Sequence, residues 1–211
     1  MKKILKRILA ITLFCGVFVS CVNDEDTDIP TLRVAFFSEG FESIQNTGNN
    51  QFIALEGWSN VSVNGGSELW EARFFSSDGK YAQMSAFGTG EANVNTWLIT
   101  PAINLDETEN EALRFSYKAA FYNGQAVSVW ISEDYDGSNT ASGINNATWT
   151  NLNVSLPDYA TSGYPNRFSL SDIIDLSDYN GNVHIAFRYV GGSSGVSTTY
   201  QIDNIKVFEN N

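Results

Sequence analysis

The sequence predicts an all-β domain built as a sandwich of two antiparallel sheets. Short runs rich in β-branched and aromatic residues recur from Leu32 onward, and several of them alternate between apolar and polar residues. Turn signals containing glycine, asparagine and aspartate separate these runs, whereas helical periodicity is nearly absent. About ten strands at this spacing are typical of a two-sheet sandwich.

Alternation locates the clearest strands in the second half of the chain. They are expected at residues 113–118, 126–132, 183–190 and 200–208. In the second of these, Val127, Val129 and Ile131 share one face, which predicts that this face is buried and that Trp130 lies opposite. Residues 170–176 could form a helical turn but fit an irregular loop or a short strand better. The Asp136-Gly137 pair is interpreted as the end of a hairpin.

The first twenty residues have the pattern of an export signal. Four basic residues precede an apolar run, residues 8–19, that is too short to span a bilayer, which takes about twenty residues. Residues 18–21, Phe-Val-Ser-Cys, resemble a bacterial lipobox, in which Cys21 is diacylated on sulfur and becomes the new N-terminus. The alternative is an ordinary secretory signal followed by a chance cysteine.

Loss of residues 1–20 makes an acidic chain more acidic. The sequence holds 24 Asp and Glu against 12 Lys and Arg, and these twenty residues contain four of the basic residues and no acidic one. The mature chain therefore has 8 basic residues and a net charge of −16. Because phosphate backbones attract basic surfaces, nucleic-acid binding is disfavoured. Cys15 leaves with the signal and Cys21 carries lipid, so no thiol remains for a disulfide, a metal or a nucleophile.

Residues 21–34 are interpreted as the lipidated cysteine and an acidic tether. Four carboxylates between Asp24 and Asp28 repel one another and favour an extended chain. An acidic stretch directly after a lipidated cysteine also resembles the surface-export signal of lipoproteins in certain Gram-negative bacteria. That resemblance implies an outer-membrane protein that is lipid-anchored and exposed at the cell surface. The alternative is a merely solvated linker.

An ordered set of phrases in the remaining chain is specific enough to indicate a family. The phrases include Glu39-Gly40-Phe41-Glu42, Gly57-Trp58, residues 95–105 (NTWLITPAINL), residues 131–137 (ISEDYDG), residues 185–189 (IAFRY) and Ile202-Asp203-Asn204-Ile205. In this order they resemble the choice-of-anchor J domain, which is related to the cleaved adhesin domains of gingipain-type secreted proteases. The resemblance covers residues 35–208, so residues 35–211 are expected to form a single domain.

The resemblance implies a jelly-roll β-sandwich similar to carbohydrate-binding modules and MAM domains. Such domains occur on secreted or surface proteins, often with structural calcium and without known catalysis. Members usually accompany other domains, whereas here the resemblance covers nearly all of the mature chain. The choice between a stand-alone adhesin and a part of a surface complex stays open.

Calcium is the metal that this composition permits, because it takes carboxylate and carbonyl oxygens and needs neither histidine nor thiolate. The resemblance places the first strand, with Glu42, beside the last strand, with Asp203. The hypothesis is that Glu42 and Asp203 help to hold one structural calcium ion, with Glu39 as a weaker candidate. The alternative is that these are edge carboxylates capped by backbone amides.

No pattern in the sequence marks a catalytic centre, and we expect the domain not to be an enzyme. His184, the only histidine, is predicted on the strand face opposite Val183, and one histidine cannot build a zinc site. A glycosidase needs two carboxylates about 5–9 Å apart, which 24 acidic residues can supply by chance.

Aromatic side chains are the candidate ligand contacts, since flat rings stack on the apolar faces of sugars. Trp70 and Trp149 border polar turns, and Tyr122, Tyr159 and Tyr164 lie in predicted loops. For most of the five tryptophans, burial in the core is the default expectation.

The leading hypothesis is a surface-exposed lipoprotein that binds a glycan or a host or partner surface protein, and meets the membrane only through its lipid. One alternative is a glycan hydrolase that uses a carboxylate pair on a jelly-roll scaffold. Another is a protein-contact accessory subunit of a surface nutrient-uptake complex. The fold cannot choose among them, because function resides in the site.

Overall fold

A computed structural model describes residues 33–210. The predicted signal peptide, Cys21 and the tether up to residue 32 lie outside the described residues. The strands are β1 (Ala35–Glu39), β2 (Ser59–Ser62), β3 (Glu71–Phe75), β4 (Gly79–Met84), β5 (Val94–Ile99), β6 (Ile103–Asn104), β7 (Glu111–Ala120), β8 (Val127–Ser132), β9 (Thr150–Asn151), β10 (Ser169–Leu170), β11 (Ile174–Asp175), β12 (Asn182–Gly191) and β13 (Thr199–Glu209). The helix α1 spans Ala141–Asn146. Within residues 33–210, no helix has the length and apolar character needed to cross a membrane.

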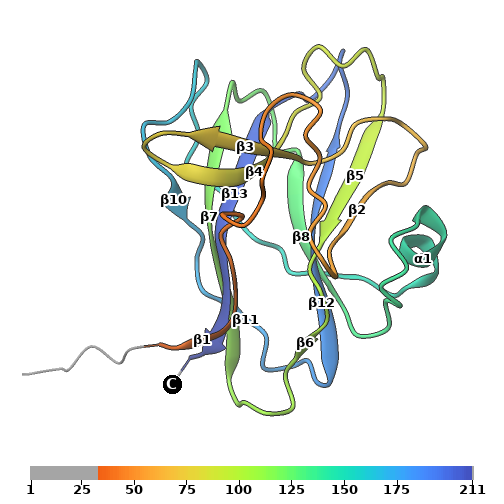
Figure 1. The fold of residues 1–211 in the computed structure, drawn as a ribbon, viewed down its shortest axis with the longest axis vertical. Coiled ribbons are helices and arrows are strands. Elements are labelled where there is room, and N and C mark those ends of the chain that lie inside the picture. Colours follow the sequence, from red (N-terminus) through yellow and green to blue (C-terminus); the bar gives the residue numbers. More distant parts are fainter. Residues whose placement is uncertain (1–32, 211) are drawn as a thin grey trace, which may run out of the picture. The chain divides into compact units, whose positions relative to one another are not determined.

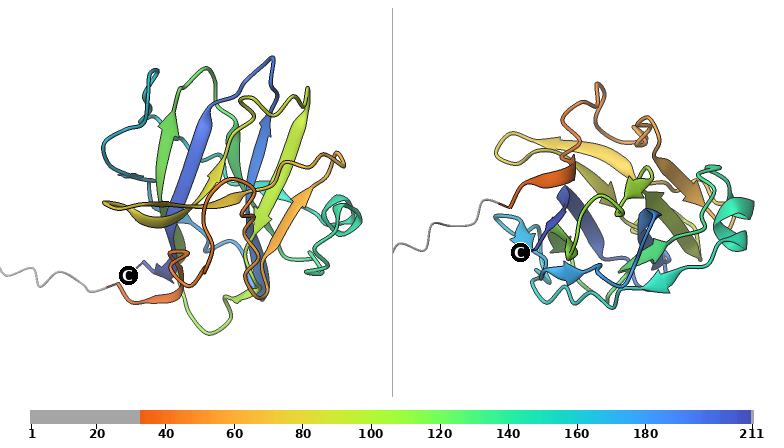
Figure 2. Two further views of the ribbon diagram at one scale, coloured as in Figure 1. Left: turned by 45° about the horizontal axis from the view of Figure 1, so that its top comes forward. Right: turned by 90° about the horizontal axis from the view of Figure 1, so that it is seen from below.

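The strands form two antiparallel sheets that face each other as layers (Figure 1). Sheet A has the order β10-β7-β13-β4-β3, with β1 paired to β13 and β11 paired to β7. Sheet B has the order β2-β5-β12-β8-β9, with β6 paired to β12. Figure 2 shows the same two layers from two further directions. The predicted all-β, two-sheet antiparallel jelly-roll sandwich is confirmed.

The core lies between the inner faces of the two sheets. Val127, Val129 and Ile131 of β8 are buried there, as the alternation predicts, because successive strand residues point to opposite faces. Phe115 of β7 and Phe187 of β12 meet edge to face with ring centroids 5.0 Å apart, so an aromatic pair joins the two sheets.

The outer face of sheet A carries a row of polar side chains. The backbone register aligns Glu71 of β3 with Gln83 of β4, Gln83 with Gln201 of β13, and Gln201 with Lys118 of β7. Tyr200 and Ile202 point into the core, so Gln201 between them points outward. Gln201 and Lys118 are nevertheless buried, at 3% and 4% exposure. This face is therefore a partly covered polar surface.

One element was not expected from the sequence. The helix α1 covers part of the outer face of sheet B (Figure 1), where Ile144 packs in a cluster with Trp97 and Ile99. It begins after Thr140, whose side chain accepts a hydrogen bond from the backbone N–H of Gly143 at 3.0 Å. Asp136-Gly137 lies in the connection between β8 and β9, which pair antiparallel, but this connection is long and includes the helix instead of a tight turn. The stretch 170–176 instead contributes the short strands β10 and β11, as the short-strand interpretation predicted.

Candidate functional site

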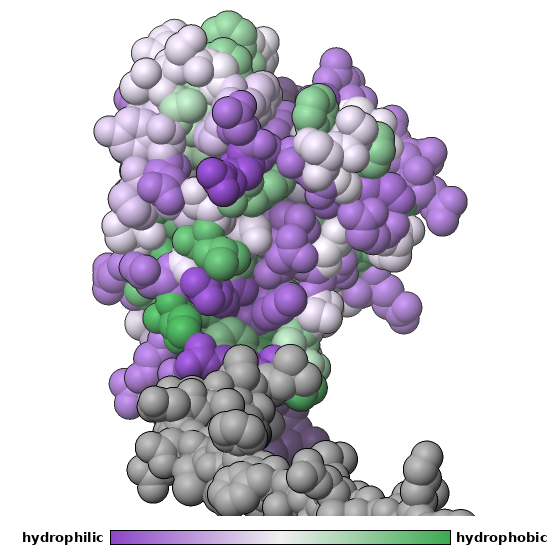
Figure 3. Space-filling model, turned by 90° about the vertical axis from the view of Figure 1, so that its left-hand side faces the viewer, coloured by the Kyte–Doolittle hydropathy of each residue, from purple (hydrophilic) through white to green (hydrophobic). Residues whose placement is uncertain are grey.

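A groove of about 400 Å³ lies on the outer face of sheet A, and we call it the aromatic groove. Its walls include Phe74, Phe75, Tyr164 and Pro165, and its floor includes Tyr81, Gln83, Lys118 and Gln201. Figure 3 shows the molecule from this side, where apolar areas lie among polar ones. The groove combines exposed aromatic walls with a polar floor, the usual composition of a small-molecule site.

The β3–β4 hairpin positions two of the aromatic rings. Phe74 and Phe75 end β3 at the edge of sheet A, and they are 56% and 58% exposed. The turn that follows is closed by a hydrogen bond from the N–H of Asp78 to the carbonyl oxygen of Phe75 at 2.9 Å. Gly79 continues the turn at φ 80°, a conformation that favours glycine. Tyr164, which is 49% exposed, approaches from the loop before β10.

The floor of the groove contains an unpaired hydrogen-bond acceptor. Nε2 of Gln201 donates to Oε1 of Gln83 at 2.9 Å. Oε1 of Gln201 is buried and has no donor among the described residues. Leaving such an oxygen without a donor costs about 1–3 kcal/mol, so a ligand that supplies a donor gains that amount in return.

Both cations that line the aromatic groove are already paired with carboxylates. Nζ of Lys118 lies 2.6 Å from Oδ2 of Asp78, and this ion pair is largely buried. The ammonium group of Lys118 also lies 4.8 Å from the centre of the Phe168 ring. Nε of Arg73 donates to Oε2 of Glu71 at 2.9 Å.

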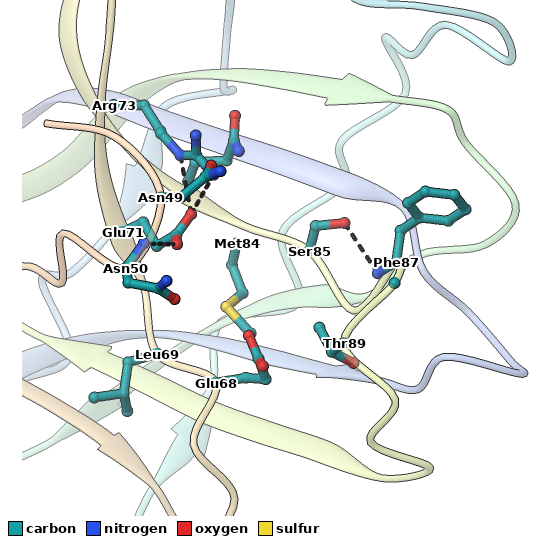
Figure 4. Close-up of a pocket in the computed structure, with 12 residues that line it drawn as sticks. Asn49, Asn50, Glu68, Leu69, Glu71, Arg73, Met84, Ser85, Phe87 and Thr89 are labelled. Carbon is teal, nitrogen blue, oxygen red and sulfur yellow. Dashed lines mark hydrogen bonds and ion pairs between the residues drawn. The ribbon is translucent and has the colours of Figure 1, made fainter.

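A second pocket, of about 300 Å³, adjoins the groove and shares Arg73 and Gln83 with it. We call it the acidic pocket, because Glu68 and Glu71 line it (Figure 4). Burial raises the pKa of Glu68, and the charges of Glu91 and Glu71 raise that pKa further. Oε1 of Glu71 accepts from the N–H of Asn50 at 2.6 Å, so hydrogen bonds occupy both of its oxygens.

The predicted calcium ligands gather near the junction of β1 and β13. Burial, together with the negative charges of Glu42, Asp78 and Glu39, raises the pKa of Asp203 to about 6, although a backbone hydrogen bond from Asn204 acts to lower it. The strand β13 is irregular here, between Asp203 and Lys206, and Asn204 has φ 48°.

Hydrogen bonds already involve each of these carboxylates. Glu39 accepts from the N–H of Phe41, and Oε1 of Glu42 accepts from the N–H of Lys80 at 2.9 Å. The ammonium group of Lys80 donates to the carbonyl oxygens of Glu42 and Ile44 at 2.8 and 2.7 Å. Across residues 33–210, no three His, Cys, Asp or Glu side chains are grouped closely enough to hold an ion. The oxygen donors suit calcium chemically, but an ion here would need backbone carbonyls beside at most two carboxylates.

Only one of the five predicted aromatic contacts lines the aromatic groove, and it is Tyr164. The prediction that Trp70 contacts a ligand was wrong. Its exposure is 0%, so its ring lies in the core and offers no face to a ligand, although polar residues flank it. Trp149 is half-buried and packs against Trp97 with ring centroids 5.0 Å apart. The rings of Tyr122 and Tyr159 stack on each other with centroids 4.0 Å apart, and neither residue lines the groove.

His184 is buried on the outer face of sheet B, the side that its strand position predicted. Its Nδ1 lies 2.8 Å from the carbonyl oxygen of Thr100. Its ring and the ring of Tyr135 meet edge to face, with centroids 5.1 Å apart. These contacts give it a packing role.

The groove residues that the sequence did not single out include Phe74, Phe75, Lys118 and Gln201. Two adjacent aromatic residues before the Ser76-Ser77-Asp78-Gly79 turn are the signal that could have located the wall. No local signal marks Gln201, because its partner Gln83 lies on a strand 118 residues away.

Solved structures with the same fold include cleaved adhesin domains of Lys-gingipain. The K1 domain, from Porphyromonas gingivalis W83, is 19% identical with a TM-score of 0.52, and the match covers 83% of this chain and 98% of that one. The K2 domain is 14% identical with a TM-score of 0.56, and the match covers 82% of this chain and 98% of that one. These similarities confirm the predicted cleaved-adhesin resemblance at the level of the fold.

No curated protein matches the chain in sequence. One family profile, described as a domain of unknown function (DUF5017), matches residues 103–211. The match spans more than half of the 211 residues, and the chain therefore belongs to the DUF5017 family.

Proposed function

We propose that the protein is a non-catalytic binding module that holds a glycan in the aromatic groove. The observation that carries this proposal is the pairing of exposed rings, Phe75 and Tyr164, with a floor of carboxamides and ion-paired side chains. A sugar ring has apolar faces that stack on aromatic side chains and hydroxyl groups that bond to a polar floor. The solved structures with this fold are named adhesin domains, which also supports a binding role.

A glycan array tests the proposal. The full chain is compared with the double variant Phe75→Ala/Tyr164→Ala, and Phe36→Ala serves as a matched control because Phe36 is 40% exposed on β1, outside the groove lining. Loss of two stacking rings should weaken retention by about tenfold or more, whereas the control should bind as the unchanged chain does. If the double variant retains glycans as well as the unchanged chain does, the groove is not the glycan-binding site. If no glycan is retained and the chain co-purifies with a membrane protein, a protein-contact accessory role replaces glycan binding.

The anchoring of the module is part of the same proposal. Cys21 carries the lipid, and the acidic tether holds the domain away from the outer membrane at the cell surface. Metabolic labelling with a radioactive fatty acid tests this step. Label should enter the unchanged chain and be lost in Cys21→Ser, and equal labelling of the two would contradict the proposal.

Calcium is proposed as a structural brace at the β1–β13 junction, held by Glu42 and Asp203 with backbone carbonyls. A cation there would offset the mutual repulsion of Glu42, Asp78 and Glu39 around Asp203. Glu39 is kept as the weaker candidate, and its carboxylate accepts a hydrogen bond from the N–H of Phe41.

A hydrolase is the second candidate, and one observation favours it. Glu68 lies in the acidic pocket beside Glu71, and its pKa is raised, as in the proton-donating carboxyl group of a glycosidase. The charge of Glu71 is already offset by its ion pair with Arg73, which lowers its basicity, so binding is preferred. Release of reducing sugars from a polysaccharide panel, abolished by Glu68→Gln, would establish the hydrolase instead.

A further inference from the structure

We infer that the aromatic groove selects neutral glycans and that Oε1 of Gln201 accepts a hydrogen bond from a sugar hydroxyl group. This inference rests on the proposed glycan-binding function and names the chemical class of the ligand. Three observations on the floor and surroundings of the groove lead to it.

The first observation is that neither cation lining the groove is free to bind an acid. Lys118 is paired with Asp78 at 2.6 Å in a largely buried position, and Arg73 is paired with Glu71. A uronate or sulfate group would meet two cations whose charge a carboxylate already offsets, and drawing Lys118 toward it would leave Asp78 without its partner. Breaking a buried ion pair is costly, so the floor discriminates against anions.

The second observation is that acidic side chains lie around the groove. At one end Glu68 and Glu71 line the acidic pocket, which shares Arg73 with the groove (Figure 4). At the other end Asp203 follows Gln201 by two positions on the same face of β13, with the charges of Glu42 and Glu39 acting on it. The negative charge of Glu68 at the first end repels an anionic ligand, and the Asp203 end does the same while no cation is bound there.

The third observation is the unpaired acceptor. Gln201 is 97% buried, and its Oε1 lacks a donor within residues 33–210, while its Nε2 is held by Gln83 at 2.9 Å. The carboxamide is therefore fixed in orientation, with an oxygen that only a donor can satisfy. Sugar hydroxyl groups supply such donors, whereas a carboxylate oxygen would face this oxygen as a second acceptor.

The test uses a matched pair of oligosaccharides. β-1,4-Mannohexaose has a hydroxymethyl group at carbon 5 where β-1,4-linked hexamannuronate has a carboxylate. Xylohexaose, cellohexaose and β-1,4-galactohexaose are further neutral sugars. Hexagalacturonate is a second acidic one. Isothermal titration measures binding of each to the full chain, to Gln201→Met and to the control Gln45→Met, in which an exposed glutamine is changed. The neutral sugar that binds most tightly should bind more than tenfold tighter than either acidic sugar. Gln201→Met should weaken that binding by about tenfold, the value of one hydrogen bond to a buried acceptor, and Gln45→Met should not.

The outcomes separate this inference from the proposed function. If no hexasaccharide binds, in the neutral or the acidic set, glycan binding itself fails. If an acidic sugar binds as tightly as a neutral one and Phe75→Ala/Tyr164→Ala weakens both, the groove binds glycans but the selectivity for neutral ones is wrong. If Gln201→Met keeps full affinity, the role of its oxygen is overturned. The comparison of neutral and acidic sugars on the unchanged chain stands even if Gln201→Met does not fold.

Discussion

Gln201 on β13 donates a hydrogen bond to Gln83 on β4 across 2.9 Å, and its other amide atom, Oε1, has no donor in the described part of the chain. The backbone register places the two glutamines opposite each other on the outer face of sheet A. The contact therefore fixes the floor of the aromatic groove and leaves one buried acceptor unsatisfied.

Gln83→Leu is expected to destabilise the fold. The change leaves the buried Nε2 of Gln201 without its acceptor, which costs about 1–3 kcal/mol of unfolding free energy. Urea denaturation measures the difference, and Gln45→Leu, at an exposed position, should change stability by less than about 0.5 kcal/mol. Equal stability of the two variants would show that the glutamine contact does not form.

Lys118→Met should lower the free energy of unfolding by more than the loss of a surface charge does. It leaves Asp78 as a largely buried carboxylate without its cation, which costs about 3–5 kcal/mol. The double variant Lys118→Met/Asp78→Asn removes both charges and should recover most of the loss in urea denaturation. A loss below about 1 kcal/mol for the single variant would show that the pair behaves as a solvent-exposed one.

Asp203 should make the protein more stable at mildly acid pH than at neutral pH. Its pKa is raised from the ordinary 3.8 to about 6, so the folded chain holds a proton that the unfolded chain has released. The stability from this group is present at low pH and is lost as the pH rises through about 6.

Thermal unfolding measured between about pH 7.5 and about pH 5 checks the direction of this pH dependence, because the carboxyl group of Asp203 titrates within this window in the folded chain. The melting temperature should rise on acidification in the unchanged chain, and this rise should be smaller in Asp203→Asn, which carries no charge. An identical pH profile for the two proteins would contradict the raised pKa.

Calcium should raise the melting temperature at neutral pH, because a ligand that binds only the folded state stabilises it. Chelator should lower the melting temperature of calcium-loaded protein, and Asp203→Asn should abolish both responses. Ser43→Ala, which changes an exposed residue beside Glu42 but removes no carboxylate, is the matched control. A melting temperature that calcium and chelator leave unchanged would refute the brace.

The strands could be predicted because their pattern is local. In β8 the alternation of Val127, Val129 and Ile131 with polar or outward residues identifies both the strand and its buried face. The helix α1 escaped prediction because six residues, including Gly143, are too few to show a helical period.

The site was harder to predict, because it depends on which distant strands become neighbours. Tyr164 could be chosen from its polar surroundings, but the same argument chose Trp70, which the core buries completely. Flanking polarity does not determine which way a side chain points. The alignment of Gln83 with Gln201 arises only when β4 pairs with β13, which no local pattern encodes.

The most direct test of the central claim is amide chemical-shift mapping by NMR with a neutral hexasaccharide that the chain retains on the array. The shifts should be confined to the aromatic groove, around Phe75, Gln83, Lys118, Tyr164 and Gln201. Shifts confined to sheet B and α1, or the absence of any glycan that produces saturable shifts, would contradict the claim that this groove is the binding site.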